Sequence, residues 1–394
     1  MKTKICGMFI ASIITLTNVT LISPSTQVDW NVTSNGMNGF SYEYKDGILK
    51  ITSSAASGKI TWLSKNSYNV EPDGIYRFSY DVIQSANATA VCFNTDGTPI
   101  IDSSTMTSSD TSLTTQTWRQ ESIAFKIPSG VTAIKIGGYV TSEGQVMLKN
   151  VKVERIHSKS KPIVTFRIDD GHKSTIDVAK PILDRYGYVA VSAVVSKAVQ
   201  VELPGYMNIN DVKSLYAHGW EIASHSYNHT HGIDEYQANA SKEYLHSQGI
   251  NPTTFVYPYG SWNYTSMDVC KKYYQVLSTC DAFPNYPPYD FTRVNVKILS
   301  SNTSMDQVGG WLNETGDGEW IVFVIHDVSD NSSEFGTITP HMLDEVCRAV
   351  NAQGFDVVTF RDVYLKYFQS SFDNVRIDWV QKLCNNAERA QLID

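Results

Sequence analysis

The chain from Gln27 to Ile156 consists of short runs in which hydrophobic and polar residues alternate. "GIYRFSYDVI", "QESIAFKIP" and "TAIKIGGYV" are examples, and turn-forming residues such as Gly, Asp, Asn and Pro separate the runs. Successive side chains of a β-strand point to opposite faces, so this alternation predicts strands with one buried face. Several such strands divided by turns are typical of an antiparallel β-sandwich.

From Ile163 onward the pattern changes to apolar runs separated by segments with a helical period. "PIVTFRI", "YVAVSAVV" and "WIVFVIHD" predict buried strands. "TIDVAKPILDRYG", "NINDVKSLYAHGW" and "ITPHMLDEVCRAVNAQG" predict helices, the second of them capped near Asn210. Alternating strands and helices predict an α/β domain with a parallel sheet, either open or barrel-like.

These changes of pattern divide the chain into a series of predicted segments. They are a signal peptide (1–26), a β-sandwich (27–157), a linker (158–162), an α/β domain (163–368) and a C-terminal tail (369–394). The linker region is polar and basic and ends in Pro162, a composition that favours a short connection between domains.

The first residues have the pattern of a secretory signal, because Lys2 and Lys4 precede an apolar stretch that small and polar residues follow. An uncleaved membrane anchor is the alternative. Thr15, Thr17 and Asn18 argue against it, because they interrupt the run before the roughly 20 apolar residues that a bilayer span needs. We therefore expect a secreted or cell-surface protein with no membrane span after signal cleavage.

The formal net charge of -8 and the absence of a basic run argue against nucleic acid or an anionic membrane surface as the partner. A neutral or cationic partner fits the charge better. Asn-X-Ser/Thr triplets recur along the chain and predict a glycoprotein in a host that glycosylates exported proteins.

Polar residues collect at the ends of the predicted strands of the α/β domain. They are Asp169 and Asp170, His225 and His229, Tyr259, and His326. In parallel α/β architectures, functional groups lie at the carboxyl ends of the strands, so we expect these side chains to share one face.

The two histidines His225 and His229 stand four residues apart, so both imidazoles can face one point. With a nearby carboxylate they would form a set that leaves coordination positions open for water, as a catalytic metal requires. The spacing alone is a weak motif. Because strand side chains alternate, one of the adjacent aspartates Asp169 and Asp170 can bind a cation while the other acts as a base.

Together these residues resemble the motifs of the polysaccharide deacetylase family (carbohydrate esterase family 4), whose members remove acetyl groups from sugars. "FRIDDG", "HSYNH", "YPYG" and "VIHD" resemble the first, second, third and last family motifs in the family's order. The resemblance extends from about Pro162 to Tyr367, and four motifs in order are far more specific than any one of them. It implies a distorted (β/α) barrel for this domain.

The resemblance also implies a role for each residue of the site. The implied ligands of a divalent metal are Asp170, His225 and His229, a set that suits Zn²⁺ and would also accept cobalt or nickel. Asp169 would be the general base, and His326 would protonate the departing amine. The backbone N–H of Tyr259 would stabilise the oxyanion together with the metal.

The chain departs from the family pattern at two places. Val256 stands where the family often has an arginine that steadies the base, and the family's aspartate–tryptophan signature is missing from "STCDAFPNYPPYDF". Branches with an "F-x-Y-P-Y-G" segment, including deacetylases of poly-N-acetylglucosamine, place an arginine on a later strand. Arg293 in "FTRVNV" is therefore the candidate replacement, with a plain surface arginine as the alternative.

The sequence thus predicts an exported metal-dependent hydrolase that removes N-acetyl groups from an N-acetylglucosamine-containing polysaccharide. An O-acetyl esterase acting on a polymer such as acetylxylan, or a binding protein that has lost activity, is the alternative. A glycosidase using Asp169 and Asp170 fits worse, because its two carboxylates must flank the bond about 5–9 Å apart. The oligomeric state stays open.

The N-terminal domain resembles the carbohydrate-binding sandwiches often attached to enzymes that act on polysaccharides. Its strands contain the aromatic residues Trp30, Trp62, Tyr76, Tyr80 and Trp118. Aromatic residues in strands usually pack inward, so we expect most of these to belong to the core.

Overall fold

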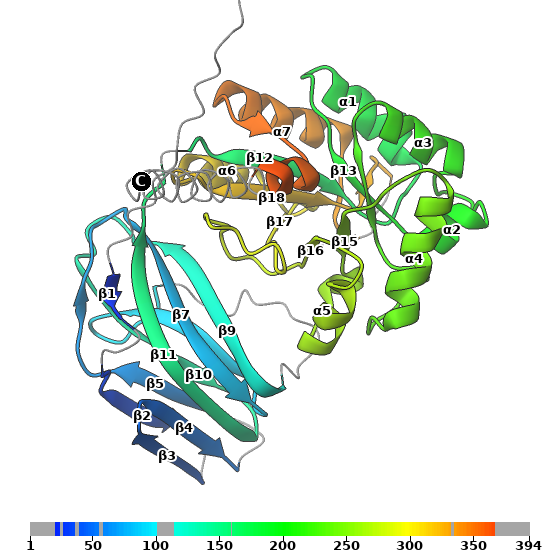
Figure 1. The fold of residues 1–394 in the computed structure, drawn as a ribbon. Helices are drawn as coiled ribbons and strands as arrows, with labels where there is room; N and C mark the ends of the chain where they lie inside the picture. The colour runs from blue at the N-terminus through cyan, green and yellow to red at the C-terminus, as the bar shows by residue number, and fades with distance from the viewer. Residues whose placement is uncertain are drawn as a thin grey trace, which may run out of the picture.

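The computed structural model describes residues 20–23, 27–35, 39–54, 58–100, 114–158, 160–331 and 335–366. It has two regions: antiparallel sheets in the N-terminal part and a parallel sheet with helices in the C-terminal part (Figure 1). Among these residues no helix is long and apolar enough to span a bilayer. The predicted tail (369–394) lies outside the described residues.

The N-terminal region contains two antiparallel sheets. The first has the order β3-β4-β11-β7-β9, with β1 beside β11. Its strands are β1 (Thr20–Ile22), β3 (Phe40–Lys45), β4 (Ile48–Ser53), β7 (Ile75–Gln84), β9 (Thr115–Lys126) and β11 (Gly144–Ile156). The second has the order β2-β5-β10-β6, with β8 beside β10. Its strands are β2 (Trp30–Asn35), β5 (Lys59–Ser64), β6 (Tyr68–Asn69), β8 (Ala88–Asn94) and β10 (Ala133–Val140).

Both antiparallel sheets contribute to one hydrophobic cluster. Phe78 and Val153 come from the first sheet, and Trp62 and Ile136 come from the second. Four of the five aromatic residues singled out in the sequence are buried, as expected, and Trp118 is the exception. Alternating strands with one buried face therefore form where the sequence pattern predicts them.

Strand β1 falls within the segment 1–26 expected to be a signal peptide, most of which lies outside the described residues. Thr20 and Ile22 pair with β11, and Ile22 is buried in the hydrophobic cluster of the two sheets. Removal of the whole segment would therefore take a strand out of the first sheet. The signal peptide and its boundary stay predictions.

The C-terminal region is built on a parallel sheet of order β16-β15-β14-β13-β12-β18-β17, in which β21 also pairs with β12. The strands are β12 (Ile163–Ile168), β13 (Val191–Val194), β14 (Glu221–Ser224), β15 (Thr254–Val256), β16 (Val276–Ser278), β17 (Lys297–Ile298), β18 (Trp320–Ile325) and β21 (Asp356–Val357). The parallel α/β domain predicted from the sequence is confirmed. In the described part of the chain, β16 and β17 end the strand order on opposite sides, so the sheet is a half-barrel.

Helices and short elements connect these strands. They are η2 (Thr175–Ala179), α1 (Lys180–Asp184), α2 (Ser196–Gln200), α3 (Ile209–Ala217), α4 (Glu235–Ser247), η3 (Pro258–Gly260), α5 (Tyr264–Cys270), α6 (Met305–Asn313), β19 (Asp327–Val328), β20 (Thr337–Ile338), α7 (Pro340–Ala352) and a last helix at 360–366. Helix α3 is capped by Asn208, two residues earlier than expected, because its side chain accepts from the N–H groups of Asn210 and Asp211.

The two faces of the parallel sheet have separate hydrophobic cores. Phe323 on β18 packs on one face with residues of α1, α3, α6 and α7, while its neighbours Val322 and Val324 pack on the other with Phe360 and Val363. Burial of both faces explains why the strands read as almost continuous apolar runs. Polar side chains inside the strands, such as Thr165 and Arg167 of β12, are buried and hydrogen-bonded, whereas those at the strand ends can face solvent.

Candidate metal centre and active site

The polar residues singled out at the predicted strand ends lie at the carboxyl edge of the parallel sheet. Asp169 and Asp170 follow β12, His225 follows β14, Tyr259 follows β15, and His326 follows β18. These four strands belong to the same parallel sheet, and β18 pairs directly with β12 up to Ile168 and Ile325. The sequence expectation that the four segments share one edge is therefore met by the topology.

Three side chains at this edge converge on one point. Oδ1 of Asp170 lies 3.2 Å from Nε2 of His225 and 3.1 Å from Nε2 of His229. The ligand atoms of the three residues all lie within 4.8 Å of one another. An Asp/His/His set of this kind leaves coordination positions open for water or substrate.

The hydrogen bonds around the three residues fit a bound metal. Nδ1 of His225 lies 2.9 Å from the carbonyl oxygen of Val256, so this nitrogen donates its proton there and Nε2 keeps its lone pair. Nδ1 of His229 lies 3.1 Å from the hydroxyl of Tyr259. Oδ1 of Asp170 is buried and has no hydrogen-bond partner among the residues that the structure describes. The lone pairs of Nε2 of His225 and of Oδ1 of Asp170 therefore face one another, and this arrangement needs a cation or a proton between the two atoms.

The pKa shifts of Asp170 and His225 also agree with a bound cation. Burial raises the pKa of Asp170, but the three histidines around it, His172 included, lower that pKa well below its ordinary value. Burial lowers the pKa of His225, whereas Asp170 and Asp169 raise it, and the net shift is upward. The carboxylate is thus ionised, and its field attracts positive charge to the imidazoles.

Backbone strain is concentrated at this edge. Asp170 (φ 69°), Ser226 (φ 62°), His229 (φ 57°) and Tyr259 (φ 58°) all have positive φ, which residues with a Cβ adopt at a cost. Such conformations persist where the surrounding structure enforces them, and they are typical of ligand-binding and active sites.

Asp169 is held by an arginine that the sequence analysis did not single out. Nη2 of Arg167 donates to Oδ2 of Asp169 at 2.8 Å, and both side chains are almost fully buried. Nη1 of Arg167 donates to Oγ of Ser278 at 2.7 Å and to the carbonyl oxygen of Thr279 at 2.9 Å. Burial lowers the pKa of Arg167, but Asp169 raises it and the net shift is upward, so the guanidinium stays charged.

The expectation that Arg293 contacts Asp169 directly is corrected by the structure. Arg293 forms ion pairs with Glu121 of β9 and with Asp290, at the boundary with the N-terminal sheets. Arg167 occupies the expected position instead. The signal was present in "FRIDDG": residues two apart on a strand share a face, so Arg167 points to the same side as Asp169.

His326 lies at the end of β18, beside the two aspartates. Its backbone N–H donates to the carbonyl oxygen of Gly336 at 2.9 Å. Nδ1 of His326 is buried and has no hydrogen-bond partner among the described residues. Burial lowers the pKa of His326, and the charges of Asp169 and Asp170 oppose part of that effect. A lowered pKa makes the protonated ring a stronger acid, which suits a group that gives up a proton.

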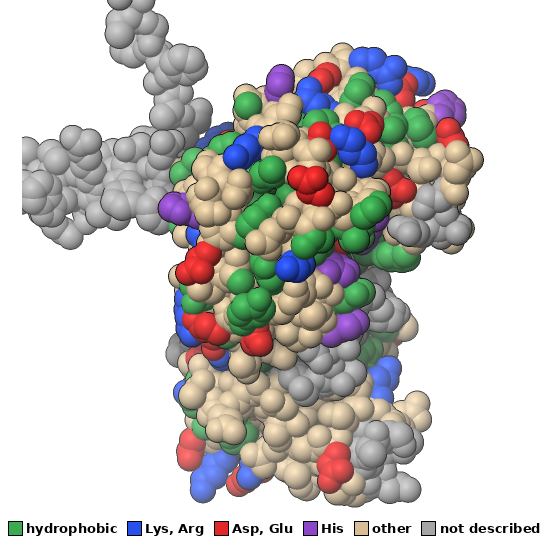
Figure 2. Space-filling model, turned by 90° about the vertical axis from the view of Figure 1, so that its right-hand side faces the viewer, with side chains coloured by type: hydrophobic (Ala, Val, Ile, Leu, Met, Phe, Trp, Pro, Cys, Tyr) green, Lys and Arg blue, Asp and Glu red, His purple; other side chains and the backbone are tan. Residues whose placement is uncertain are grey.

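Exposed aromatic rings border the site. Tyr259 is 52% exposed and stacks on His231 at 3.8 Å between ring centroids. Phe335 is 71% exposed and packs edge-on against His326. On the face drawn in Figure 2, histidine side chains lie next to hydrophobic ones, and acidic and basic side chains are interspersed around them. The edge of the sheet is thus open to solvent and flanked by apolar surface.

One family model matches the part of the chain that contains most residues of the site. Residues 157–275 match the family model "Polysaccharide deacetylase". No curated protein matches the chain. This stretch contains Arg167, Asp169, the three converging side chains and Tyr259, whereas Arg293 and His326 lie beyond it.

Similar solved structures include three deacetylase or esterase domains. The Streptococcus pyogenes deacetylase PplD in complex with acetate is 20% identical, with 39% of this chain and 70% of that chain covered and a TM-score of 0.36. The Xyl-CE4 domain of a multidomain xylanase from the hindgut metagenome of Trinervitermes trinervoides is 23% identical, with 52% and 91% covered and a TM-score of 0.39. The peptidoglycan deacetylase PdaC from Bacillus subtilis is 17% identical, with 57% and 100% covered and a TM-score of 0.38.

The family model match, and not these structural similarities, supports the assignment. Members of the matched family are hydrolytic deacetylases that depend on a metal. Residues 157–275, the stretch that contains the Asp/His/His set and Asp169, match the polysaccharide deacetylase family.

Proposed function

We propose that the chain is an exported, metal-dependent hydrolase that removes N-acetyl groups from an N-acetylglucosamine-containing polysaccharide. The observation that supports this most is the convergence of Asp170, His225 and His229 next to a buried aspartate held by an arginine. A metal-binding set and a candidate base thus lie side by side at one edge of the sheet.

In this proposal Asp170, His225 and His229 hold the metal, for which Zn²⁺ is the best fit to two imidazoles and a carboxylate. A bound divalent metal would polarise the acetyl carbonyl and lower the pKa of a water molecule. Asp169 takes up the proton of the attacking water through Oδ1, which is buried and has no hydrogen-bond partner in the described part of the chain.

Arg167 and His326 complete the set of roles. Arg167 fixes the orientation of Asp169 through the hydrogen bond to Oδ2 and leaves Oδ1 for the water. His326 donates a proton to the departing amine from the neighbouring strand β18. The backbone N–H of Tyr259 is the proposed second stabiliser of the oxyanion, because the strained turn at this residue orients its peptide group.

Two features support an amide of a polymer as the substrate. An amine leaves poorly unless it is protonated, and the histidine at His326 offers that proton, whereas a sugar alkoxide leaves more readily. The exposed rings of Tyr259 and Phe335 offer apolar surface of the kind on which sugar rings stack. The net charge of -8 also suits a product that becomes cationic on deacetylation.

Metal analysis combined with acetate release tests the proposal. We expect the purified protein to contain about one divalent ion per chain, as an Asp/His/His set predicts. Exhaustive chelation should abolish acetate release from a soluble chitooligosaccharide, and added zinc should restore it. Full turnover by a protein shown to be free of metal would contradict the mechanism.

The nature of the cleaved bond is tested by His326→Ala on two substrates. We expect the wild type to release acetate faster from chitooligosaccharide than from acetylated xylan, and the variant to lose far more amide than ester activity. Efficient deacetylation of xylan without amide turnover would instead identify an O-acetyl esterase.

A further inference from the structure

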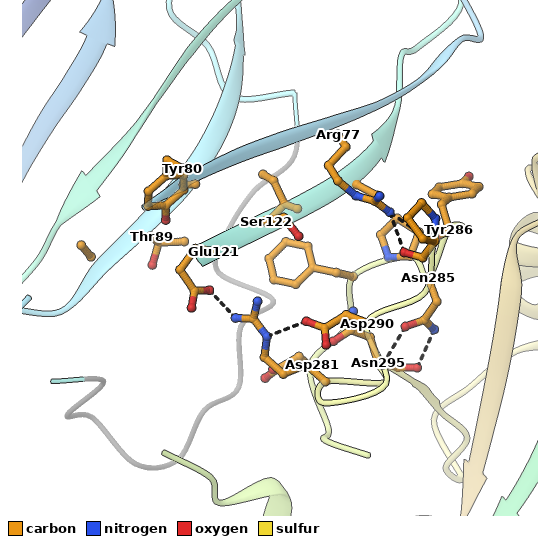
Figure 3. Close-up of a pocket in the computed structure, with 18 of the residues that line it drawn as sticks. Arg77, Tyr80, Thr89, Glu121, Ser122, Asp281, Asn285, Tyr286, Asp290 and Asn295 are labelled. Carbon is orange, nitrogen blue, oxygen red and sulfur yellow. Dashed lines mark hydrogen bonds and ion pairs between the residues drawn. The ribbon is translucent and has the colours of Figure 1, made fainter. Parts of the chain in front are cut away.

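A pocket lies at the boundary between the N-terminal sheets and the parallel α/β region, away from the metal centre. Figure 3 shows that Tyr80, Thr89, Glu121 and Ser122 line it from the N-terminal side. Residues of the segment 281–295 line the opposite side. The segment follows β16, so the two regions are in contact through the chain that continues from the sheet of the active site.

Glu121 on β9 is the central side chain of this boundary. Its Oε1 accepts from the hydroxyl of Tyr264 at 2.6 Å, and its Oε2 forms an ion pair with Arg293. Both members of the ion pair are largely buried, with about one seventh of each side chain exposed (14% for Glu121 and 15% for Arg293). Burial lowers the pKa of Arg293, but Glu121 and Asp290 raise it well above its ordinary value, so the guanidinium stays charged.

A short path of bonds leads from Arg293 to the candidate base. Val294, the next residue, accepts at its carbonyl oxygen from Oγ of Ser278 at 3.1 Å and from the N–H of Thr279 at 3.0 Å. Ser278 and Thr279 are the acceptors of Nη1 of Arg167. Nη2 of the same guanidinium donates to Asp169.

The boundary holds this segment at a second place as well. Nη2 of Arg77 donates to the carbonyl oxygens of Tyr286 and Pro288 at 3.1 and 2.9 Å. Tyr286 also packs with Ile75 and Ala124 in a small hydrophobic cluster that spans both regions. The N-terminal sheets therefore fix the backbone of the segment near its middle and near its end.

We infer that the N-terminal sheets are part of the catalytic unit, in which Glu121 and Arg293 are positioning residues for Asp169. They act through Val294, Ser278 and Arg167, and the role for Asp169 rests on the proposed function. A guanidinium displaced by a fraction of an ångström no longer orients the base, and misplacement of reacting groups costs rate rather than substrate affinity.

Glu121→Gln and Arg293→Gln test this inference in the full-length, metal-loaded protein. With soluble chitooligosaccharide we expect kcat to fall about tenfold in each variant, with KM within about twofold of wild type. The kcat of the double variant should fall by the same factor as that of either single variant, because both substitutions interrupt the same path of contacts. Metal content should not change.

Arg119→Gln is the matched control. Arg119 forms an ion pair with Asp268 on α5 across the same boundary, and its guanidinium lies 4.7 Å from the ring centroid of Tyr264. Among the described residues it forms no hydrogen bond or ion pair with Arg293, Val294, Ser278 or Arg167. We expect its kcat within about twofold of wild type. Because Asp268 is 48% exposed, losing this ion pair should lower the melting temperature less than losing the more buried pair of Glu121 and Arg293. A general loosening of the two regions would instead reduce kcat in all three variants and would overturn the inference, as would an unchanged kcat in Glu121→Gln.

Amide hydrogen exchange separates this inference from the proposed function. In Glu121→Gln the amides of Thr279 and Val294 should exchange faster than in wild type, and in Arg119→Gln they should not. If wild type releases no acetate from any acetylated sugar, the proposed function fails, and the exchange data alone decide whether the path exists. Unchanged exchange in Glu121→Gln would refute the path.

Discussion

Two carboxylates, Asp170 at the sheet edge and Glu121 at the boundary between the regions, have opposite surroundings. Each oxygen of Glu121 has a donor from the chain, the hydroxyl of Tyr264 on one and the guanidinium of Arg293 on the other. Asp170 has the nitrogen lone pairs of two imidazoles near its Oδ1, and no hydrogen-bond donor for that oxygen within the described residues.

This difference distinguishes a binding site from a structural contact. A buried carboxylate is stable when the protein supplies a cation, as Arg293 does for Glu121. Where the protein collects acceptors around a carboxylate instead, the stabilising cation has to come from outside the chain. The positive φ of Asp170 and His229 is compatible with this conclusion, because strained residues often occur at ligand-binding sites.

Asp170→Asn should have the largest effect of any single change, because it removes the only carboxylate of the metal-binding set. We expect loss of bound metal and of nearly all acetate release. Asp169→Asn should keep the metal and lose about 10²- to 10⁴-fold in kcat, the usual contribution of a general base. Metal analysis and turnover on the same preparations check both expectations.

Glu121→Gln is the control for the metal loss expected in Asp170→Asn. Glu121→Gln removes a charge that is balanced within the chain, so it should leave metal content unchanged. If Asp170→Asn also retains its metal and its activity, then Asp170 is satisfied by the chain in the same way as Glu121, and the distinction between the two regions is wrong.

Arg167→Leu should have the next largest effect, because it leaves Asp169 buried without its cation. Removing one partner of a buried ion pair costs about 3–5 kcal/mol of unfolding free energy. The double variant Arg167→Leu with Asp169→Leu should recover most of that stability while remaining inactive. Urea unfolding measures the free energies, and equal stability of the single and double variants would show that the pair is solvated.

Gly336→Ala should perturb His326 without touching the metal set. A Cβ at this position would lie 2.0 Å from Nδ1 of His326, and the backbone has φ +76°. Strain of about 1–2 kcal/mol is expected for a residue with a Cβ in this conformation. The displaced imidazole should cost about tenfold in amide turnover and less in ester turnover. Equal losses on both bonds would argue against His326 as the proton donor.

The sequence predicted the parallel sheet and the residues at its edge because both depend on local pattern. Apolar runs identified β12 and β18, and polar residues directly after such runs identified Asp170 and His326. Arg167 was not predicted, because an arginine inside an apolar run gives no sign of its partner by itself. The alternation of side chains along a strand does place Arg167 on the same face as Asp169.

The partner of Arg293 could not be predicted in the same way. Glu121 lies 172 residues earlier in the chain, and no local pattern connects it to "FTRVNV". The placement depends on how the two regions pack against each other, which is a property of tertiary structure. Position at a strand end indicated that Arg293 was functional but gave no information about which carboxylate it would meet.

Trp118→Ala should have the smallest effect, confined to binding of insoluble polymer. Trp118 is the exposed member of the aromatic set, 37% exposed on β9, and Lys149 lies 4.0 Å from its ring centroid. If the N-terminal sheets bind sugar, this ring is the best candidate for stacking on it, since the strand also contacts the α/β region through Arg119 and Glu121.

We expect Trp118→Ala to weaken binding to insoluble chitin by about two- to tenfold, the range for loss of one exposed aromatic contact, while kcat on soluble oligomers stays unchanged. Tyr42→Ala is the matched control, because Tyr42 is 49% exposed on β3 at the opposite edge of the same sheet. Binding by co-sedimentation with the polymer is the measurement. Weaker chitin binding in Trp118→Ala alone would show that the N-terminal sheets bind polymer in addition to the proposed positioning of Asp169. Equal binding by wild type and both variants would argue against polymer binding through this ring.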